Sequence, residues 1–499
     1  MRDDFDQNNA LLPGLPAYED GRMSDGIYDA GQGRYIAFND GKPYASLRER
    51  RVETLQKEAR RLALCGCKTR VTELEDGRLA FDVTGRDREY HAVRDGASFT
   101  VTPRDIRPGL KLDRHCMLRA VTETTLSAFE AYAARLEAAG FEKIWTNQIE
   151  NNHFCEFQKD ERLIYAAFMG NSGTARFEDD TVSAPIPQLS GGAPIPCVKT
   201  QLCQFGLYYD KMISGVTADC GMLYLLRLPD NSLFIIDGGE YEQATDAAIA
   251  ELMRLMRTWT DVQAGEKIRV AAWMCTHAHD DHLDVFGKLI RLHHDEMDVQ
   301  RLIFNFPAFA HYEPMFSAYV ALARLNEYYP NAKYLKPHAG QEMTLAGVKL
   351  QFLQTHEDSV GAGGNELIGG FNDTSLVVKI SFDGVSFLVL GDMNRDAERI
   401  LLENYHETLH ATAVQPAHHL FNLLPHAYEV IGADIALIPT NFRNVGAEDP
   451  RYQNLLRSIP RESMCFAAEG TTIWEARDGK LLLVERLPVV GGPFDGTGV

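Results

Sequence analysis

Three histidines and three aspartates lie within ten residues in the segment CTHAHDDHLD, positions 275–284. Such a cluster is costly to hold together unless a cation lies among its members. In an extended segment alternate side chains point the same way, so His277, His279 and Asp281 can all face inward. His282 can then turn toward a neighbouring point. Two imidazoles at one point, with a carboxylate and an imidazole beside them, suit two zinc ions. Two metals about 3.5–4 Å apart can share a hydroxide and make it nucleophilic at neutral pH.

The alternative for this segment is a polar surface turn. The apolar segment KIRVAAWMCT, positions 267–276, leads directly into the histidines and is typical of a buried strand. A loop that leaves a buried strand starts inside the protein, which favours metal binding. Asp280 points opposite to its neighbours, and we expect it to be solvated.

The pattern THAHDDH resembles the H-x-H-x-D-H signature of the metallo-β-lactamase fold superfamily. FIIDGG and FLVLGDM are similar to the Asp-Gly-Gly and the Gly-Asp that end two strands in that superfamily. AVQPAHHLFN and FNDTSLVVKI resemble the branch that includes the hydrolase domain of DNA-uptake competence proteins. The similarity covers roughly residues 200–485. It implies an α/β protein with the αββα metallo-β-lactamase sandwich.

The resemblance also implies roles for three residues outside the histidine motif. Asp392 would bridge both metals. Asp237 would lie behind the histidines and orient them, because a zinc-bound imidazole needs its other N–H held. Asn372, before the strand that leads to the Gly-Asp, would support the site from behind in the same way.

Two ligands stay open at this point. The branch usually has Gly after its double histidine where this chain has Leu420, so either His418 or His419 could face the second metal. The superfamily's third motif is a lone histidine on the first metal. His356, in LQFLQTHEDS, is our choice, because it ends a strand before the Asn-Asp-Thr-Ser segment.

His311 and His338 compete with His356 for that position. An isolated histidine is more often a solvated or core residue than a ligand, and for these two we favour that reading. The first zinc would then be held by His277, His279 and His356. The second zinc would be held by Asp281 and His282, with His418 or His419.

The chain divides by composition into four parts. We expect a loose leader at residues 1–33, an N-terminal α/β accessory domain at 34–180, a Pro/Gly-rich linker at 181–197 and the metallo-β-lactamase-fold domain at 198–490. In the accessory domain, the spacing of Leu126, Phe129, Ala133 and Leu136 predicts a helix that stops at Gly140.

The chain has 499 residues and a formal net charge of −20, from 50 Lys and Arg against 70 Asp and Glu. Such an excess of acid disfavours long nucleic acid, whose phosphates are bound through Lys and Arg. A small anionic substrate held by a metal remains compatible with it. No apolar run reaches the roughly 18 residues of a membrane helix, and no signal peptide opens the sequence. With nine scattered cysteines, we expect a cytoplasmic protein with no membrane partner. Its oligomeric state is unknown from the sequence.

These observations favour a metallohydrolase with two zinc ions, or manganese or iron in their place. A bridging hydroxide would attack, the metals would stabilise charge on the substrate oxygen, and Asp281 and Asp392 would be the catalytic carboxylates. By resemblance the substrate is a phosphoester or phosphodiester, with a lactam, lactone or thioester as alternatives. The rival hypotheses are a nuclease of the same fold, a non-catalytic metal-dependent sensor or scaffold, and a di-iron oxygen-handling protein. Related di-iron proteins typically carry Glu where this chain has His279.

Overall fold

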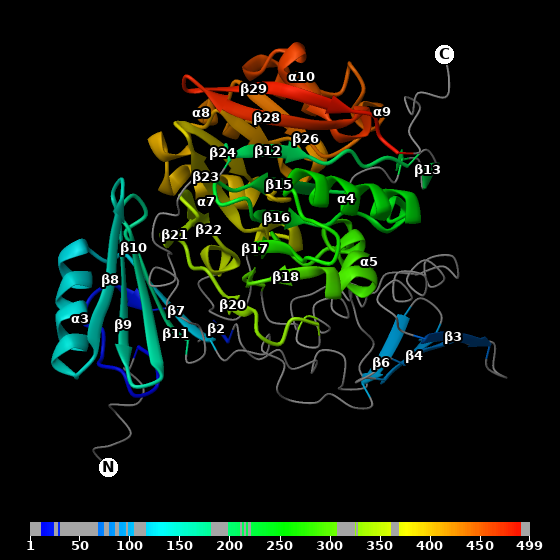
Figure 1. Ribbon diagram of the computed structural model, residues 1–499. Coiled ribbons are helices and arrows are strands. Elements are labelled where there is room, and N and C mark those ends of the chain that lie inside the picture. The colour runs from blue at the N-terminus through cyan, green and yellow to red at the C-terminus, as the bar shows by residue number, and fades with distance from the viewer. Residues whose placement is uncertain are drawn as a thin grey trace.

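Two sheets packed face to face, with helices on both outer sides, form the larger part of the molecule (Figure 1). The computed structural model describes residues 11–23, 28–29, 116–180, 198–209, 212–213, 216–217, 221–306, 325, 328–360 and 369–490, and four strands between residues 68 and 103. No helix among these residues is both long and apolar enough to cross a membrane.

The first sheet begins with parallel strands and continues as an antiparallel one. Its strands are, in order across the sheet, β20 (Lys333–Leu335), β19 (Arg301–Ile303), β17 (Ile268–Met274), β16 (Leu233–Asp237), β15 (Leu223–Arg227), β12 (Gln201–Gln204), β28 (Thr471–Arg477) and β29 (Lys480–Leu487), with β18 (Met297–Val299) also beside β17. The pairs from β20 to β16 are parallel. The motif of residues 275–284 therefore follows a buried strand, as the sequence predicts, and that strand is central and parallel to both neighbours.

In the second sheet, the antiparallel strands come first and the parallel strands follow. Its strands are, in order, β21 (Glu342–Leu345), β22 (Val348–Gln354), β23 (Val377–Phe382), β24 (Val385–Val389), β25 (Ala413–Gln415), β26 (Ile435–Ile438) and β27 (Met464–Phe466). The hairpin between β23 and β24 turns at Asp383 and Gly384, both with positive φ. Beyond β24 the strands are parallel, so the Gly-Asp after β24 and the double histidine after β25 lie at the same edge.

The alternation of side chains along β16 shows how the layers form. Phe234 and Ile236 are buried between the two sheets, whereas Leu233 and Ile235 pack against helices on the outer side. Those helices are α4 (Asp246–Trp259) and α5 (Asp284–His293). Because both faces of the strand are covered, its residues are apolar throughout.

The outer side of the second sheet is covered by α7 (Arg395–Asn404), α8 (Ala427–Ile431), α9 (Phe442–Val445) and α10 (Pro450–Ser458). The layers therefore run helix, sheet, sheet, helix. This confirms the αββα sandwich predicted from the sequence.

A separate antiparallel sheet precedes the sandwich in the chain. Its strands are, in order, β1 (Arg22–Met23), β7 (Cys116–Thr122), β11 (Thr174–Asp180), β10 (Arg162–Met169), β9 (Asn152–Lys159) and β8 (Glu142–Ile149), with β2 (Tyr28–Asp29) also beside β7. We call it the accessory sheet. The predicted helix is α3 (Leu126–Ala138), and its residues Phe129, Ala133 and Leu136 are buried against one face of the sheet. A further meander of β3 (Lys68–Glu73), β4 (Leu79–Thr84), β5 (Glu89–Asp95) and β6 (Ser98–Pro103) lies in the same part of the chain.

The prediction of a loose leader at residues 1–33 does not hold for residues 11–23. Leu11, Leu12, Leu15 and Tyr18 are buried in the same apolar cluster as α3. Four large apolar side chains in eight residues outweigh the turn-forming Pro and Gly between them, because each gains burial under the helix. The predicted linker at 181–197 lies outside the described residues.

The other face of the accessory sheet packs on the sandwich (Figure 1). Phe154, Tyr165 and Met169 belong to the same buried cluster as Leu390 and Tyr405 of the sandwich. The accessory sheet and the sandwich therefore meet in a buried contact, which we call the interdomain seam.

Candidate metal centre

The loop after β17 is fixed at its first residue by both sheets. The Thr276 N–H donates to Oδ1 of Asp237 at 2.7 Å, and the Thr276 carbonyl accepts from the N–H of Leu376 at 2.9 Å. The loop then turns into a short 3-10 helix, η4 (Asp280–His282). Because of this turn, the motif is not extended throughout, and its second half faces a different point from its first half.

Two groups of potential ligands form around one carboxylate. In the first group are His277, His279 and Asp392. In the second are Asp281, His282, His419 and again Asp392. The ligand atoms of each group lie within 4.8 Å of one another. The structure thus brings together the residues in which the sequence predicts two adjacent sites, with Asp392 common to both.

The spacing of the second group suits a metal ion. Nε2 of His282 lies 3.2 Å from Nε2 of His419 and 3.1 Å from Oδ1 of Asp392. Nε2 of His419 lies 3.2 Å from Oδ2 of Asp281. Nitrogen and oxygen ligands about 2.0–2.2 Å from a tetrahedral zinc ion lie roughly 3.3–3.6 Å from one another. The donor atoms therefore already stand at about the separations that one ion requires.

Buried polar atoms that lack hydrogen bonds point to the same conclusion. His277 and Asp392 are fully buried. In the described part of the chain, no hydrogen bond of good geometry reaches Nε2 of His277 or the carboxylate of Asp392, whose oxygens lie 3.1 and 3.3 Å from the Nε2 atoms of His282 and His419. Buried polar atoms without partners are rare in proteins. These residues therefore fit a centre in which metal ions complete their coordination.

The two groups differ in protonation. Burial lowers the pKa of His279 to about 4 and holds that of His277 well below its usual range. Both are neutral imidazoles, which is the form that binds metal. Burial also acts to lower the pKa of His419, but the carboxylates of Asp392 and Asp281 outweigh it and raise this pKa to about 9. In the second group a metal ion would take the place of a proton.

Asp237 lies behind the histidines, where the sequence places it. Its Oδ2 accepts a hydrogen bond from Nδ1 of His282 at 2.6 Å and from the Thr276 hydroxyl at 2.7 Å. This leaves Nε2 of His282 directed at the ligand group. The glycines that follow β16 let α5 approach the strand end, because a Cβ atom at Gly238 would lie 2.3 Å from that of Phe286. Only glycine lets α5 pack this closely to the strand end.

Asp392 is held by backbone contacts from two sides. Its N–H donates to the hydroxyl of Ser375 at 2.9 Å, and the side chain of Gln415 accepts from the N–H of Gly391 at 2.8 Å. Gly391 has φ 58°, and a Cβ atom there would lie 2.7 Å from that of Ser375. The Gly-Asp and Ser of the sequence pattern are thus one interlocked unit.

The double histidine forms an unusual turn. His418, His419 and Leu420 have φ values of 49°, 51° and 62°, in the left-handed region that non-glycine residues avoid. The turn is attached to the Gly-Asp by a hydrogen bond from the His418 N–H to the Gly391 carbonyl at 3.0 Å. Three such residues in a row cost about 1 kcal/mol or more each, a strain that proteins concentrate at functional sites.

This turn separates the roles of the two histidines. His419 is fully buried, and its Nδ1 donates to the Pro439 carbonyl at 3.1 Å, which directs Nε2 at the second group. His418 is 22% exposed, and its Nε2 lies 3.8 Å from Oδ2 of Asp392. Of the two alternatives left open by the sequence, the structure brings His419 into the ligand group and leaves His418 at its rim.

Asn372 supports that rim. It lies in η8 (Phe371–Thr374), and its Nδ2 is 3.2 Å from Nε2 of His418. Asn422 also contacts the His418 ring, at Nδ1. Asn372 therefore lies behind His418 rather than behind one of the grouped ligands.

The predicted ligand set needs a correction at His356. It is fully buried in η7 (His356–Ser359), and its Nδ1 lies 3.3 Å from the carbonyl of Asn305. The structure does not bring it into either ligand group. The strand before it ends as predicted, but the following 3-10 turn directs the ring at the end of β19. His338 is buried away from the centre, and His311 lies outside the described residues.

Sequence reasoning missed two residues of this site. Thr276 donates twice to Asp237, and its place directly before the first histidine is the only signal. The ring of Phe371 lies 4.6 Å from that of His279 and forms an apolar wall beside the first group. No pattern in the sequence marks Phe371.

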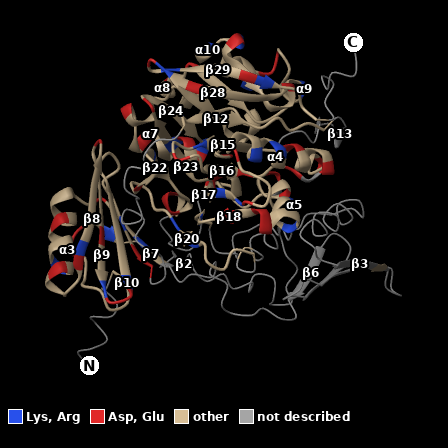
Figure 2. Ribbon diagram, in the orientation of Figure 1, with Lys and Arg blue, Asp and Glu red and all other residues tan. Residues whose placement is uncertain are grey.

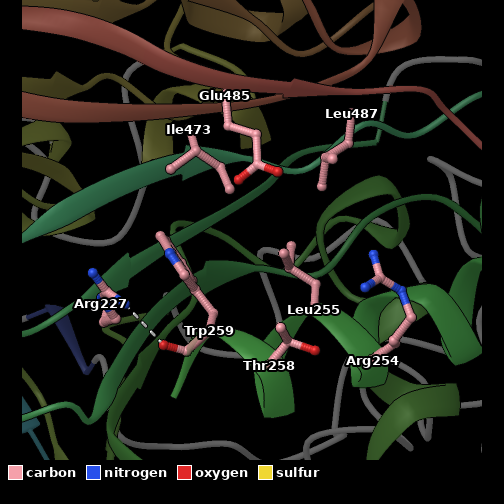
Figure 3. Close-up of a pocket in the computed structure, with 8 residues that line it drawn as sticks. All are labelled: Arg227, Arg254, Leu255, Thr258, Trp259, Ile473, Glu485 and Leu487. Carbon is pink, nitrogen blue, oxygen red and sulfur yellow. Dashed lines mark hydrogen bonds between the residues drawn. The ribbon is translucent and has the colours of Figure 1, made fainter. Parts of the chain in front are cut away.

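A pocket of about 160 Å³ lies elsewhere, between α4 and the strands β28 and β29 (Figure 3). It is lined by Arg227, Arg254, Leu255, Thr258, Trp259, Ile473, Glu485 and Leu487. The guanidinium of Arg227 donates to the Trp259 carbonyl at 3.1 Å. The pocket shares no residue with the metal centre.

No family model matches the chain, and no curated protein matches it. Similar solved structures include CmlA, a diiron β-hydroxylase from Streptomyces venezuelae, with 14% identity over 52% of this chain and 40% of that chain and a TM-score of 0.23. Rubredoxin oxygen:oxidoreductase from Desulfovibrio gigas has 13% identity over 42% of this chain and 47% of that chain, with a TM-score of 0.24. A point mutant of the flavo di-iron protein from Thermotoga maritima has 12% identity over 50% and 42%, with a TM-score of 0.21.

The match spans less than half the length of each of these proteins. The reaction of this chain is therefore inferred from its own residues.

Proposed function

We propose that this chain is a metal-dependent hydrolase with a dinuclear centre that cleaves a phosphoester or phosphodiester. One observation carries this proposal: two groups of metal-binding side chains share the carboxylate of Asp392. A shared carboxylate between adjacent sites is what a two-metal hydrolase needs.

The residues of the candidate centre have distinct roles. When bound, two metal ions lower the pKa of a water molecule and polarise a substrate oxygen. His277, His279, His282 and His419 would hold the ions with the carboxylates of Asp281 and Asp392. Asp237 fixes the orientation of His282 by accepting from its Nδ1.

The partly exposed side of the centre is where substrate would enter. The side chain of Asp281 is 17% exposed, whereas those of His282 and Asp392 are fully buried. Asp281 is therefore the carboxylate that can accept a hydrogen bond from an attacking water molecule and orient it. His418 lies on the same exposed side and would contact the substrate.

The substrate class rests on resemblance and charge together. The double histidine and the Asn-Asp-Thr-Ser segment resemble the competence-protein branch, which favours a phosphodiester. The net charge of −20 favours a small anionic molecule over long DNA or RNA. In the view of Figure 2, Lys and Arg are scattered among Asp and Glu over the described elements. We infer a small phosphodiester, with zinc as the metal and manganese or iron as alternatives.

A metal-reconstitution assay tests the proposal. Metal-free protein is loaded with zinc or manganese, and its metal content is measured together with cleavage of bis-p-nitrophenyl phosphate, single-stranded DNA and duplex DNA. We expect about two ions per chain and cleavage of the small diester. Degradation of DNA with an inert small diester would favour the nuclease. Bound metal without any turnover would favour the non-catalytic sensor, and failure to bind metal would overturn the site.

The chain offers a matched control for the metal count. His406, Glu407 and His410 form an exposed group that could also bind a metal ion. The variant H406Q/H410Q removes this surface group. It should retain the two ions and full activity, whereas Asp392→Asn should lose both.

A further inference from the structure

Strand β11 carries charge on the face that is turned toward the sandwich. Ala175 and Phe177 pack under α3 on one face. The alternate residues Arg176, Glu178 and Asp180 point to the other face, and all three are buried. Buried charges require partners, and these partners lie in the sandwich.

Arg176 forms an ion pair across the interdomain seam. Its guanidinium lies 2.5 Å from Oδ1 of Asp358, and the two side chains are 7% and 2% exposed. The other oxygen of Asp358 accepts at 2.8 Å from the N–H of Thr355, the residue that caps η7. One carboxylate thus joins the accessory sheet to the first turn of η7.

A second contact lies beside the first. Nδ1 of His338 is 2.9 Å from Oε2 of both Glu178 and Glu357. The ammonium of Lys336 lies 3.3 Å from Oε1 of Glu357. Burial acts to lower the pKa of His338, but Glu357 and Glu178 raise it to about 10. Glu178 and Glu357 therefore both lie against the His338 ring, and Glu357 of η7 is attached to the seam as well.

From η7 the contacts continue to the metal centre. The hydroxyl of Ser359 donates to the carbonyl of Asp373 at 3.4 Å, so η7 lies against η8. Asp373 also accepts from the N–H groups of Asn394 and Ala397 at the start of α7, at 2.9 and 3.1 Å. Its neighbours in η8 are Asn372 and Phe371, which contact His418 and His279.

We propose that Arg176 is a positioning residue of the metal centre, which holds η7, and through it η8, against His279 and His418. This inference rests on the proposed function. It makes the accessory sheet a working part of the hydrolase rather than a separable binding module.

The test uses a charge-neutral double variant. R176M/D358N removes the ion pair without leaving a buried charge unpaired, and the asparagine still offers an oxygen to the Thr355 N–H. Arg162 and Asp179 supply the matched control, because they form a comparable ion pair at 2.5 Å between β10 and β11 on the opposite face of the same sheet. R162M/D179N should leave the metal centre unchanged.

Two readouts are followed in all proteins. The first is the visible absorption spectrum of the cobalt-substituted protein, which reports the coordination of the ions. The second is hydrogen exchange over peptides that cover residues 353–360 and 369–377. For R176M/D358N we expect a changed cobalt spectrum, faster exchange in both peptides and a kcat about tenfold lower, in the range of residues that support metal ligands. The control should match the wild type.

Equal spectra and equal exchange in R176M/D358N and the wild type would overturn the proposal. If the double variant does not fold, Arg176→Lys replaces it. This change keeps the positive charge but loses the guanidinium that contacts Asp358, and faster exchange than in the wild type is then expected in the two peptides. Wild-type protein that binds no cobalt would contradict the proposed function instead, and the exchange rates alone would then decide whether Arg176 holds η7 and η8.

Discussion

Nδ1 of His282 lies 2.6 Å from Oδ2 of Asp237, which is 45 residues earlier in the chain. The carboxylate ends β16 and the imidazole ends η4, so two parallel strands of one sheet bring them together. Asp237 also accepts from the N–H and the hydroxyl of Thr276. Both its oxygens therefore accept hydrogen bonds from the protein, and Asp237 acts on the candidate centre by orienting His282.

From this relationship we predict that Asp392→Ala lowers the metal content more than Asp237→Ala does. The first change removes a ligand from both groups. The second leaves all ligands in place and typically costs about 10–100-fold in metal affinity or activity. Elemental analysis after dialysis against a weak chelator would measure both variants. Equal loss in the two proteins would show that the roles are wrongly assigned.

Metal ions should also stabilise the folded chain. At a free zinc concentration 100 times the Kd, binding to the folded state alone adds about 2.7 kcal/mol per site to the free energy of unfolding. We expect a chelator to lower the Tm of the wild type by several degrees and added zinc to restore it. Asp392→Asn should lose this response, while H406Q/H410Q should keep it. A Tm that is independent of zinc in the wild type would contradict the prediction.

Glu156 should make stability depend on pH. It lies in the interdomain seam, and burial raises its pKa from 4.5 to about 7. Between these values the folded chain holds a proton that the unfolded chain releases. The contribution to stability is therefore full below pH 4.5 and is lost as the pH rises through 7, by up to about 3 kcal/mol.

Glu156→Gln removes this titration, so its stability should fall less than that of the wild type between pH 5 and pH 8. Urea unfolding at both pH values would measure the difference. Glu161→Gln, an exposed change in the turn of the same hairpin, is the control. An identical pH dependence in Glu156→Gln and the wild type would refute the role of this carboxyl.

At Leu420, backbone strain and side-chain burial have opposite effects on stability. Its φ of 62° strains the backbone by about 1–2 kcal/mol, which glycine would relieve. Its side chain is fully buried beneath α8, and loss of a buried leucine costs about 2–5 kcal/mol. Burial is the larger effect, so Leu420→Gly should lower the free energy of unfolding despite the strain. At Ala346, with φ 47° and only a methyl group to lose, the glycine variant should be as stable as the wild type or more so.

The sequence predicts the ligands that its strands position directly. His277 lies where the buried strand before it places it, and Asp392 lies where the resemblance of FLVLGDM places it. It cannot choose between His418 and His419, because the choice depends on three successive left-handed residues that no propensity predicts. His356 was misplaced for a similar reason. A strand end fixes where a side chain begins, but the 3-10 turn after it decides where the ring points.

The sequence does not predict the interdomain seam either. Strand β11 has apolar and charged residues in alternation, which is typical of a strand with one face in water. Arg176 and Glu178 are buried instead, because partners about 160–180 residues later in the chain neutralise them. Ion pairs between distant segments leave no periodic signal.

The same seam has a consequence for synthesis of the protein. The Nδ2 atom of Asn152 donates to the carbonyl of Asn404, which is 252 residues later, and the Tyr165 hydroxyl donates to that of Ala339, which is 174 residues later. At about 5–20 residues per second, a ribosome needs roughly 10–50 s to make the longer stretch. During that time an apolar face of the accessory sheet, which includes Phe154 and Met169, is exposed to water. The nascent chain should therefore be a client of ribosome-associated chaperones until α7 is complete.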